Sequence, residues 1–353
     1  MDIVDFLKKV VDESGSDIFI VAGRPLTYKL HGHVVSLDEE RLSPDKTEEL
    51  VRTVYFLAGE RDISRLVLTG DDDFSFSIPG IARFRVSAYK QRGSLAAVIR
   101  VVTFTLPSPK DLNIPDSVLS LSKYNKGLVL VTGPAGSGKT TTLACVIDLI
   151  NQMRSDHIVT LEDPLEYLHN HKKSIVSQRE ISSDTESYVK ALRAALRQAP
   201  DVVLLGEMRD YETINVAMTA AETGHLVIST LHTVGAASTI DRIIDVFPSN
   251  QQHQIRVQLS MVLQAVVSQQ LLPTTDKKIA PVFEIMFANG AIRNMIRESK
   301  IHQIDTVIQS SAAEGMVTMD TGLLNLYKQG IISEADAVAY STNPEIMAKR
   351  VKL

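Results

Sequence analysis

Gly133-Pro-Ala-Gly-Ser-Gly-Lys139-Thr140 is the stretch that decides the fold of this 353-residue chain. An apolar run over residues 128–132 predicts a strand before it, and a helical pattern follows from Thr140 to about Met153. Glycines in such a loop let backbone N–H groups point at phosphate oxygens, and the helix N-terminus adds partial positive charge. The sequence therefore predicts a P-loop that binds a nucleoside triphosphate.

The residues of this loop have distinct expected roles. Lys139 is expected to reach the β and γ phosphates, and Thr140 to offer its hydroxyl to Mg²⁺. The predicted nucleotide-binding residues here are Gly133, Pro134, Ala135, Gly136, Ser137, Gly138, Lys139, Thr140 and Thr141. A P-loop reads no base, so the pattern by itself does not select ATP.

Acidic residues follow two further apolar strands. The strand predicted over 201–205 leads to Glu207, where P-loop folds place an acid that holds the water shell of the metal or polarises the attacking water. Glu162 and Glu166, with Asp163 between them, follow a strand predicted over 157–161. Clustered carboxylates suit a site beside a cation or an attacking water, but acidic turns before a proline are also common.

Two histidines bracket the next predicted strand, over 226–230. His225 and His232 could sense the γ-phosphate, although a lone histidine is more often a packing residue. Arginines that could neutralise charge on the γ-phosphoryl group from a neighbouring subunit are Arg83, Arg85, Arg92, Arg100, Arg193, Arg197 and Arg209. A surface ion pair is the simpler interpretation of any one of them.

The patterning before the P-loop differs from the patterning after it. Helical spacing over 2–13 and 44–57 is combined with short runs typical of strands, at 16–21, 26–30, 74–78, 82–89 and 96–102. These runs predict an α+β domain over 1–103 with a mostly antiparallel sheet. Three prolines then predict a stiff linker over 104–115.

From residue 116 onward, uninterrupted apolar strands alternate with helices. This pattern is typical of an α/β domain whose parallel sheet is covered on both faces. Beyond about residue 285 the chain is predicted to be helical, with Gly330 closing one helix and Ser333 capping the next. We therefore expect a second domain over 116–353 with C-terminal helices over about 285–353.

Composition excludes several classes of protein. A net charge of -5, no tryptophan and 5% aromatic residues argue against a basic, base-stacking track for nucleic acid. One cysteine, Cys145, cannot form a disulfide or a cysteine-based zinc site within the chain. The uncharged stretch Val257–Thr275 is interrupted by polar residues and predicts an amphipathic helix, not a membrane span. We expect a cytoplasmic protein without direct membrane insertion.

Four motifs in this order resemble those of the type II/IV secretion ATPase superfamily. After the P-loop, the run from Glu162 to Glu166 resembles the Asp box, 206–210 resembles the Walker B region, and 221–233 resembles the His box. The resemblance implies a PAS-like N-terminal domain before a RecA-like ATPase domain, assembled as a homohexamer. It also implies ATP and Mg²⁺ bound between the two domains.

Site roles follow from the same resemblance, residue by residue. Glu207 is implied as the Walker B acid and metal residue, Glu166 as the first choice for the general base, and Glu162 as the second. His225 and His232 are implied as His-box residues. Arginines supplied by the N-terminal domain to the nucleotide are implied to be Arg83, Arg85 and Arg100.

The segment Ala291-Ile-Arg-Asn-Met295-Ile-Arg-Glu298 resembles the AIRNLI motif of the PilT family, the type IV pilus retraction (twitching motility) ATPases. Its Ile292 and Ile296 share one helical face and Arg293 another, so core packing and a coupling surface are both open interpretations. The resemblance implies a motor for pilus retraction that acts on an inner-membrane platform protein at the cytoplasmic face of the membrane.

Three alternatives stay open from the sequence. Pilus assembly and type II secretion ATPases share the superfamily, but the extension enzymes usually carry a four-cysteine zinc site that one cysteine cannot form. A nucleic-acid translocase would need the basic, aromatic track that the composition lacks. A non-hydrolysing structural ring would not need Lys139, Glu166 and Glu207 together.

Overall fold

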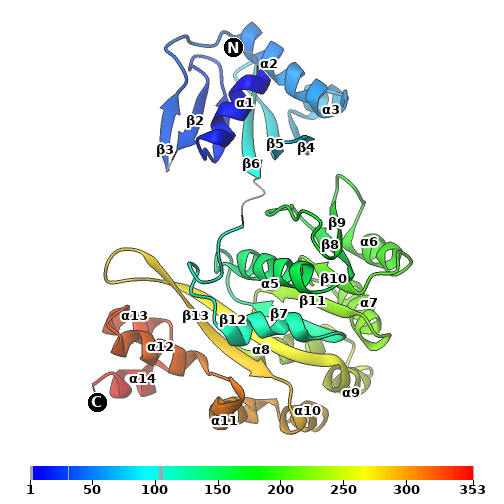
Figure 1. Cartoon of the computed structure of the whole chain (residues 1–353), viewed down its shortest axis with the longest axis vertical. Helices are drawn as coiled ribbons and strands as arrows, with labels where there is room; N and C mark the ends of the chain where they lie inside the picture. Colours follow the sequence, from blue (N-terminus) through cyan, green and yellow to red (C-terminus); the bar gives the residue numbers. More distant parts are fainter. Residues whose placement is uncertain (1–2, 31, 103–105, 353) are drawn as a thin grey trace. The chain divides into compact units, whose positions relative to one another are not determined.

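The computed structural model describes residues 3–30, 32–102 and 106–352 (Figure 1). The chain divides mainly into two compact units, one ending at Thr105 and the other beginning at Leu106. The predicted turn residue His31 and the start of the predicted linker, 104–105, lie outside the described residues. No helix within the described ranges is long and apolar enough to cross a membrane.

The N-terminal unit is an α+β domain built on one antiparallel sheet of strand order β3-β2-β1-β6-β5-β4. The strands are β1 (Asp17–Ile20), β2 (Thr27–Leu30), β3 (His33–Ser36), β4 (Asp71–Ile78), β5 (Ala82–Gln91) and β6 (Ser94–Val102). The helices are α1 (Ile3–Asp12), α2 (Pro44–Leu57) and α3 (Ser64–Thr69). Phe6, Val51 and Phe84 are buried together in its core. This is the PAS-like architecture that the motifs implied.

The edge strand β3 was not predicted from the sequence. Its side chains are mostly exposed, including Val34 at 63%. An edge strand with little burial leaves no clear alternation of apolar and polar residues, so the periodicity that marks the other strands is absent.

The second unit is an α/β domain with a seven-stranded sheet of order β13-β12-β7-β11-β10-β8-β9. The strands are β7 (Gly127–Thr132), β8 (His157–Glu162), β9 (Ile175–Glu180), β10 (Val202–Leu205), β11 (Leu226–Leu231), β12 (Leu263–Pro273) and β13 (Ile279–Phe287). All neighbours are parallel except β12 and β13. The sheet has the RecA-like form expected for a P-loop ATPase domain.

Helices cover both faces of this sheet, as buried strands require. One face packs against α4 (Asp116–Leu119) and α5 (Lys139–Met153). The other packs against α6 (Tyr188–Ala195), α7 (Tyr211–Glu222), α8 (Ala236–Asp245) and α9 (Gln252–Val262). Alternate residues of β7 divide between the faces: Leu128 and Leu130 join one core, Val129 and Val131 the other.

The predicted linker and the predicted helix over Val257–Thr275 both need correction. Leu106, Leu112 and Ile114 pack against the core under α5, so residues 106–115 belong to the second unit. The helix α9 ends at Val262, and residues 263–273 form strand β12. This strand lies between β7 and β13 and is buried on both faces. Burial on both faces removes the alternation that would have identified a strand.

The C-terminal helices are α10 (Gly290–Arg297), α11 (Ile304–Ser310), α12 (Met319–Lys328), α13 (Glu334–Ala339) and α14 (Pro344–Arg350). In Figure 1 the helices α12–α14 gather beside the β12–β13 hairpin. Leu272 and Val282 of that hairpin share a small core with them. Ser333 caps α13 with its side chain, and Gly330 has a left-handed φ of 71°, as the sequence predicted.

Candidate nucleotide-binding and hydrolysis site

The P-loop joins β7 to α5 through three glycines with positive φ. A Cβ on Gly133 would lie 2.1 Å from the carbonyl oxygen of Gln269, and a Cβ on Gly138 2.9 Å from the Gln269 side chain. Gly138 is left-handed, with φ of 84°, and precedes the first residue of α5. Glycine is required at both positions because the loop packs directly on β12.

Polar groups of the loop point to phosphate binding. The Lys139 ammonium donates to the carbonyl oxygens of Gly133 and Pro134, each at 2.9 Å, which holds it over the loop. Thr142, in the first turn of α5, donates to Gln269 at 2.7 Å and fixes the helix start to β12. The buried hydroxyl of Ser137 has no hydrogen-bond partner within the described residues. A loop with an unsatisfied donor, a lysine and a helix N-terminus suits an anionic ligand.

The strand order gathers the predicted polar residues at one edge of the sheet. The strands β7, β11, β10 and β8 are parallel neighbours, so their carboxyl ends meet beside the P-loop. His232 follows β11, Glu207 follows β10, and Glu162 ends β8. His232 and Glu207 are therefore one and two strands away from the P-loop strand. Because adjacent strands lie about 4.8 Å apart, both side chains start within about 10 Å of that strand.

Glu207 is held between two cationic or potentially cationic side chains. Its Oε2 lies 3.2 Å from His232 Nε2, and its Oε1 lies 2.5 Å from an Arg209 guanidinium nitrogen. The carboxylate is 13% exposed. The hydrogen bond to Glu207 raises the pKa of Arg209. The structure therefore brings together the predicted Walker B acid, one predicted His-box residue and one of the candidate arginines.

The two candidates for the general base occupy different surroundings. Glu162 is buried at the end of β8, beside Leu161, whose carbonyl accepts from Gly206 N at 2.8 Å. Glu166 is exposed in the loop between β8 and β9. That loop is anchored one residue earlier, where Leu165 N donates to Glu180 at 3.1 Å. Within the described residues, the Glu166 carboxylate makes no hydrogen bond or ion pair.

His225 does not lie with the other predicted site residues of the chain. It precedes β11, at the opposite edge of the sheet from His232. Seven residues of strand span about 23 Å. The imidazole Nδ1 lies 3.0 Å from the carbonyl oxygen of Ala220 near the end of α7. Grouping both histidines in one hydrolytic site is therefore wrong for a single chain, because neighbours in a motif sit at opposite ends of one strand.

The N-terminal arginines predicted to bind nucleotide lie on β5 and β6. Arg85 and Arg100 are directly opposite each other in the strand register, and Arg83 is two residues earlier on β5. Arg100 donates to Asp17 at 2.9 Å. Burial raises the pKa of Asp17, but hydrogen bonds from Arg100 and Ser16 bring that pKa below its usual range. Action of these arginines on a neighbouring subunit's nucleotide stays a prediction.

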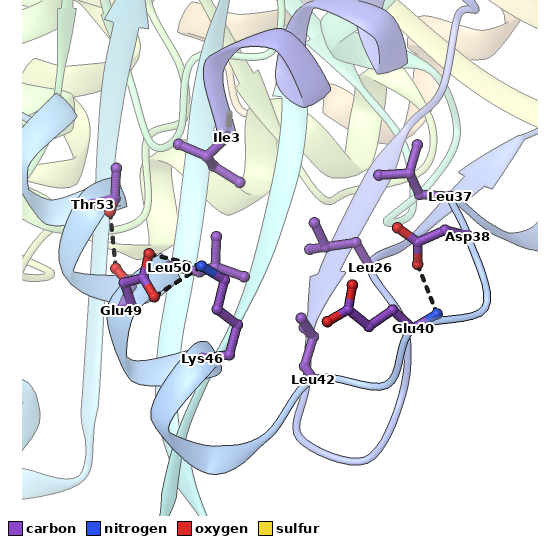
Figure 2. Close-up of a pocket in the computed structure, with 10 residues that line it drawn as sticks. All are labelled: Ile3, Leu26, Leu37, Asp38, Glu40, Leu42, Lys46, Glu49, Leu50 and Thr53. Atoms are coloured by element: carbon purple, nitrogen blue, oxygen red, sulfur yellow. Dashed lines mark hydrogen bonds and ion pairs between the residues drawn. The ribbon is translucent and has the colours of Figure 1, made fainter. Parts of the chain in front are cut away.

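A hollow in the N-terminal unit has a different character (Figure 2). Its volume is about 210 Å³, and leucines and Ile3 line it together with several charged residues. Two of those charges are already paired, because Lys46 and Glu49 lie 2.8 Å apart. Asp38 accepts from the backbone of Glu40 at 3.1 Å. Nothing among these groups resembles a phosphate or metal site.

The residues at the sheet edge fit Mg²⁺ bound together with a nucleotide. Within the described residues there is no cluster of three or more His, Cys, Asp or Glu side chains that could hold a metal alone. Mg²⁺ is usually held by one or two protein ligands, substrate phosphates and water. Thr140 at the start of α5 and Glu207 at the end of β10 are the predicted protein ligands, and they supply that donor set.

The helix α10, which carries the AIRNMI segment, is anchored in two ways. Ile292 and Ile296 are fully buried in the core, which confirms the packing interpretation of that face. Arg293 donates to the carbonyls of Ser260 and Met261 at the end of α9, at 2.7 and 3.0 Å. Its guanidinium is therefore used within the chain.

Sequence reasoning missed residues that support the site from elsewhere in the fold. Gln269 comes from the strand that was predicted as helix. Thr233 and Thr239 share a hydrogen bond of 2.7 Å that ties the loop after His232 to α8. Gln269 and Thr239 belong to no motif, Thr233 ends the His box without an assigned role, and only the tertiary fold brings these residues to their contacts.

Comparisons with known proteins agree with these features. The Type II/IV secretion system protein family matches residues 2–345. The chain is 46% identical over 322 residues to the twitching motility protein of Neisseria gonorrhoeae, covering 91% of this chain and 85% of that protein. It is 41% identical over 345 residues to the type IV pilus retraction ATPase PilT of Pseudomonas aeruginosa, covering 98% and 99%.

A solved structure gives the same result at the level of the fold. The crystal structure of the pilus retraction motor PilT with bound ADP is similar with a TM-score of 0.89 and 46% identity, covering 98% of both chains. This similarity extends over both units and the P-loop site described above. The chain belongs to the type II/IV secretion system protein family.

Proposed function

We propose that this chain is an ATP-hydrolysing motor that powers type IV pilus retraction. The observation that carries the proposal is the arrangement at the carboxyl edge of the sheet. There a complete P-loop lies beside Glu207, which His232 and Arg209 hold in place. Near full-length similarity to a retraction ATPase and to a retraction motor that binds ADP supports the assignment of substrate and task.

Different residues of the site have different roles in hydrolysis. Backbone N–H groups of the P-loop and Lys139 bind the phosphates, and Thr140 and Glu207 would hold the metal with its water shell. A Mg²⁺ ion bound there with ATP would supply charge neutralisation for the phosphates. Glu162 or Glu166 takes the proton of the attacking water; within one chain Glu162 ends the strand that pairs with the Walker B strand.

The motor is proposed to work as a homohexamer at the cytoplasmic face of the inner membrane. Arg83, Arg85 and Arg100 of one N-terminal unit would neutralise charge on the nucleotide of a neighbouring subunit. ATP binding would close this N-terminal unit onto the ATPase domain of the neighbouring subunit. Release of phosphate would then reverse the closure and move an inner-membrane platform protein. Support comes from the exposed position of Arg100 on β6 and from the cationic pair it forms in register with Arg85.

The test combines an enzyme assay with a cell assay. Lys139→Ala is expected to abolish Mg²⁺-dependent ATP hydrolysis, because the ammonium next to the phosphates is lost. Lys349→Ala, an exposed lysine on α14, is the matched control and should leave turnover unchanged. Near-normal hydrolysis by the Lys139→Ala protein would refute the site assignment.

Cells lacking the protein distinguish retraction from assembly. We expect such cells to accumulate surface pili and lose twitching, with rescue by the wild-type chain but not by Lys139→Ala. Cells without pili would indicate an assembly ATPase instead. Strong, salt-sensitive stimulation of hydrolysis by DNA would indicate a translocase.

A further inference from the structure

Tyr188 lies beside the acidic edge of the site, although it belongs to none of the motifs. It is the first residue of α6, which Ser187 caps by accepting from Lys190 N. Its ring is half-buried and packs against the core between the sheet and α7. The ring position is therefore fixed by a helix start and by core packing, which makes the direction of the hydroxyl well defined.

The Tyr188 hydroxyl lies where the ends of β8 and β10 run side by side. A Cβ on Gly206 would lie 2.8 Å from that hydroxyl, 3.3 Å from the Leu161 carbonyl oxygen and 3.4 Å from Glu162 Cα. Gly206 has no left-handed φ that would require glycine. What glycine provides at this position is the space that the tyrosine hydroxyl occupies, directly before Glu207.

The charges of three carboxylates at two strand ends act on this hydroxyl. Burial raises the pKa of Tyr188, and the charges of Asp163, Glu207 and Glu162 raise it further, while Arg209 lowers it. The phenol therefore stays neutral at any working pH and keeps its proton. A neutral phenol next to carboxylates can serve as a hydrogen-bond donor to them or to water that they hold.

We propose that Tyr188 is a positioning residue for hydrolysis, whose hydroxyl donates to water held by the carboxylates at the ends of β8 and β10. The donor holds Glu162 and Glu207 in the arrangement that activates the attacking water. The inference rests on the proposed ATP hydrolysis. It concerns the chemical step and not nucleotide affinity, because Tyr188 lies on the side of Glu207 away from the P-loop strand.

Tyr188→Phe removes only the hydroxyl and keeps the ring in the core. We expect kcat to fall about tenfold, equivalent to one lost interaction of the transition state. The KM for ATP and the affinity for a fluorescent ADP should stay within about twofold, and the melting temperature should not change. Tyr340→Phe in the C-terminal helices is the matched control and should leave all four quantities unchanged.

Gly206→Ala provides a second and independent variant. Its Cβ would displace the hydroxyl and should lower kcat in the wild-type background. In the Tyr188→Phe background the contact with the hydroxyl is lost and the 3.3 Å contact with the Leu161 carbonyl oxygen remains, so we expect Gly206→Ala to lower kcat less than it does in wild type, and the two effects to be non-additive.

Each result decides between the interpretations. Unchanged kcat in an active Tyr188→Phe protein, a fall in ADP affinity as large as the fall in kcat, loss of the fold, or additive effects in the double variant would each overturn the role of Tyr188. A wild-type protein without ATPase activity would overturn the proposed function, and this inference with it.

Discussion

The two edges of the seven-stranded sheet use polar side chains in opposite ways. At the carboxyl edge, Glu207 meets His232 and Arg209, and side chains face one another around the P-loop. At the amino edge, His225 and Arg293 bond to backbone carbonyls at the ends of α7 and α9. The comparison teaches that the topology decides the role of a motif residue. At the carboxyl edge such a residue takes part in the reaction site, and at the amino edge it stabilises the fold.

The strongest test of this comparison is Glu207→Gln at the carboxyl edge. The substitution keeps the shape of the side chain but removes the charge that pairs with Arg209 and His232 and that would hold the metal's water. We expect ATP hydrolysis to fall by about 100-fold or more, the size typical of a lost electrostatic group in a transition state. Steady-state turnover checks the rate, and circular dichroism checks that the fold is retained. Turnover above a tenth of wild type would contradict the assignment.

His225 and His232 lie at opposite ends of β11, so substituting each of them compares the two edges of the sheet within one strand. His232→Ala should lower kcat about tenfold, because a hydrogen bond to a charged group is worth about 1.5–3 kcal/mol when well formed and less when half exposed. His225→Ala should instead lower the free energy of unfolding by about 0.5–1.5 kcal/mol and leave kcat within about twofold. Turnover and urea unfolding of both proteins give the comparison. The reverse pattern would show that edge position does not predict role.

Substitution of Glu284 tests how the first residues of two helices are held against the sheet. This buried carboxylate accepts from Ala236 N, the first residue of α8, at 2.7 Å and from Met319 N, the first residue of α12, at 3.1 Å. Glu284→Gln places an amide NH₂ against one of those N–H groups. We expect a loss of about 1–3 kcal/mol in the free energy of unfolding, the cost of one buried unsatisfied donor. Urea unfolding at constant pH measures it, and Glu298→Gln, at an exposed glutamate that ends α10, is the control.

The ionisation of Glu284 adds a pH dependence. Burial raises the pKa of the Glu284 carboxyl above its ordinary 4.5, and the charges of Asp305 and Asp320 raise it further. The two backbone hydrogen bonds lower this pKa but do not cancel the increase. The folded chain therefore holds the proton more tightly than the unfolded chain. The stability of wild type relative to Glu284→Gln should fall as pH rises from 4.5 through the raised pKa. A relative stability that rises over this window would contradict the shift.

The sequence predicted the carboxyl edge better than the amino edge. The P-loop and the strands before Glu162, Glu207 and His232 were predicted because each is a local pattern, and topology then had only to bring strand ends together. The predicted strand over 226–230 already separated His225 from His232, but their common motif led us to group them in one site, and the strand register places them at opposite ends of β11.

Other features depend on contacts that no local pattern encodes. Strand β12 was predicted as helix because it is buried on both faces, and its Gln269 contacts the P-loop from more than 100 residues away in sequence. The two helix starts that share Glu284, and the hydroxyl of Tyr188 beside Gly206, are likewise tertiary. Such residues have ordinary neighbours in sequence and become part of the site only through the order of the strands.

Arg293 gives the smallest expected effect and returns to the amino edge. Its guanidinium bonds two carbonyls at the end of α9 and the side-chain oxygen of Gln264 at 3.0 Å. Arg293→Ala should therefore cost about 1 kcal/mol of stability, as for a lost hydrogen-bonding group at a helix end. ATP hydrolysis should stay within about twofold.

Arg297 of the same helix is the matched control for Arg293. It is exposed, and among the described residues its guanidinium has only a 3.5 Å contact, with Asn294. Arg297→Ala should leave both stability and turnover unchanged. Loss of pilus retraction in Arg297→Ala cells with normal turnover would identify the exposed face of α10 as a coupling surface. Loss in Arg293→Ala cells alone, together with the lower stability, would trace the defect to the end of α9. If retraction is normal in both variants, the role of α10 is the core packing of Ile292 and Ile296, and neither arginine couples hydrolysis to retraction.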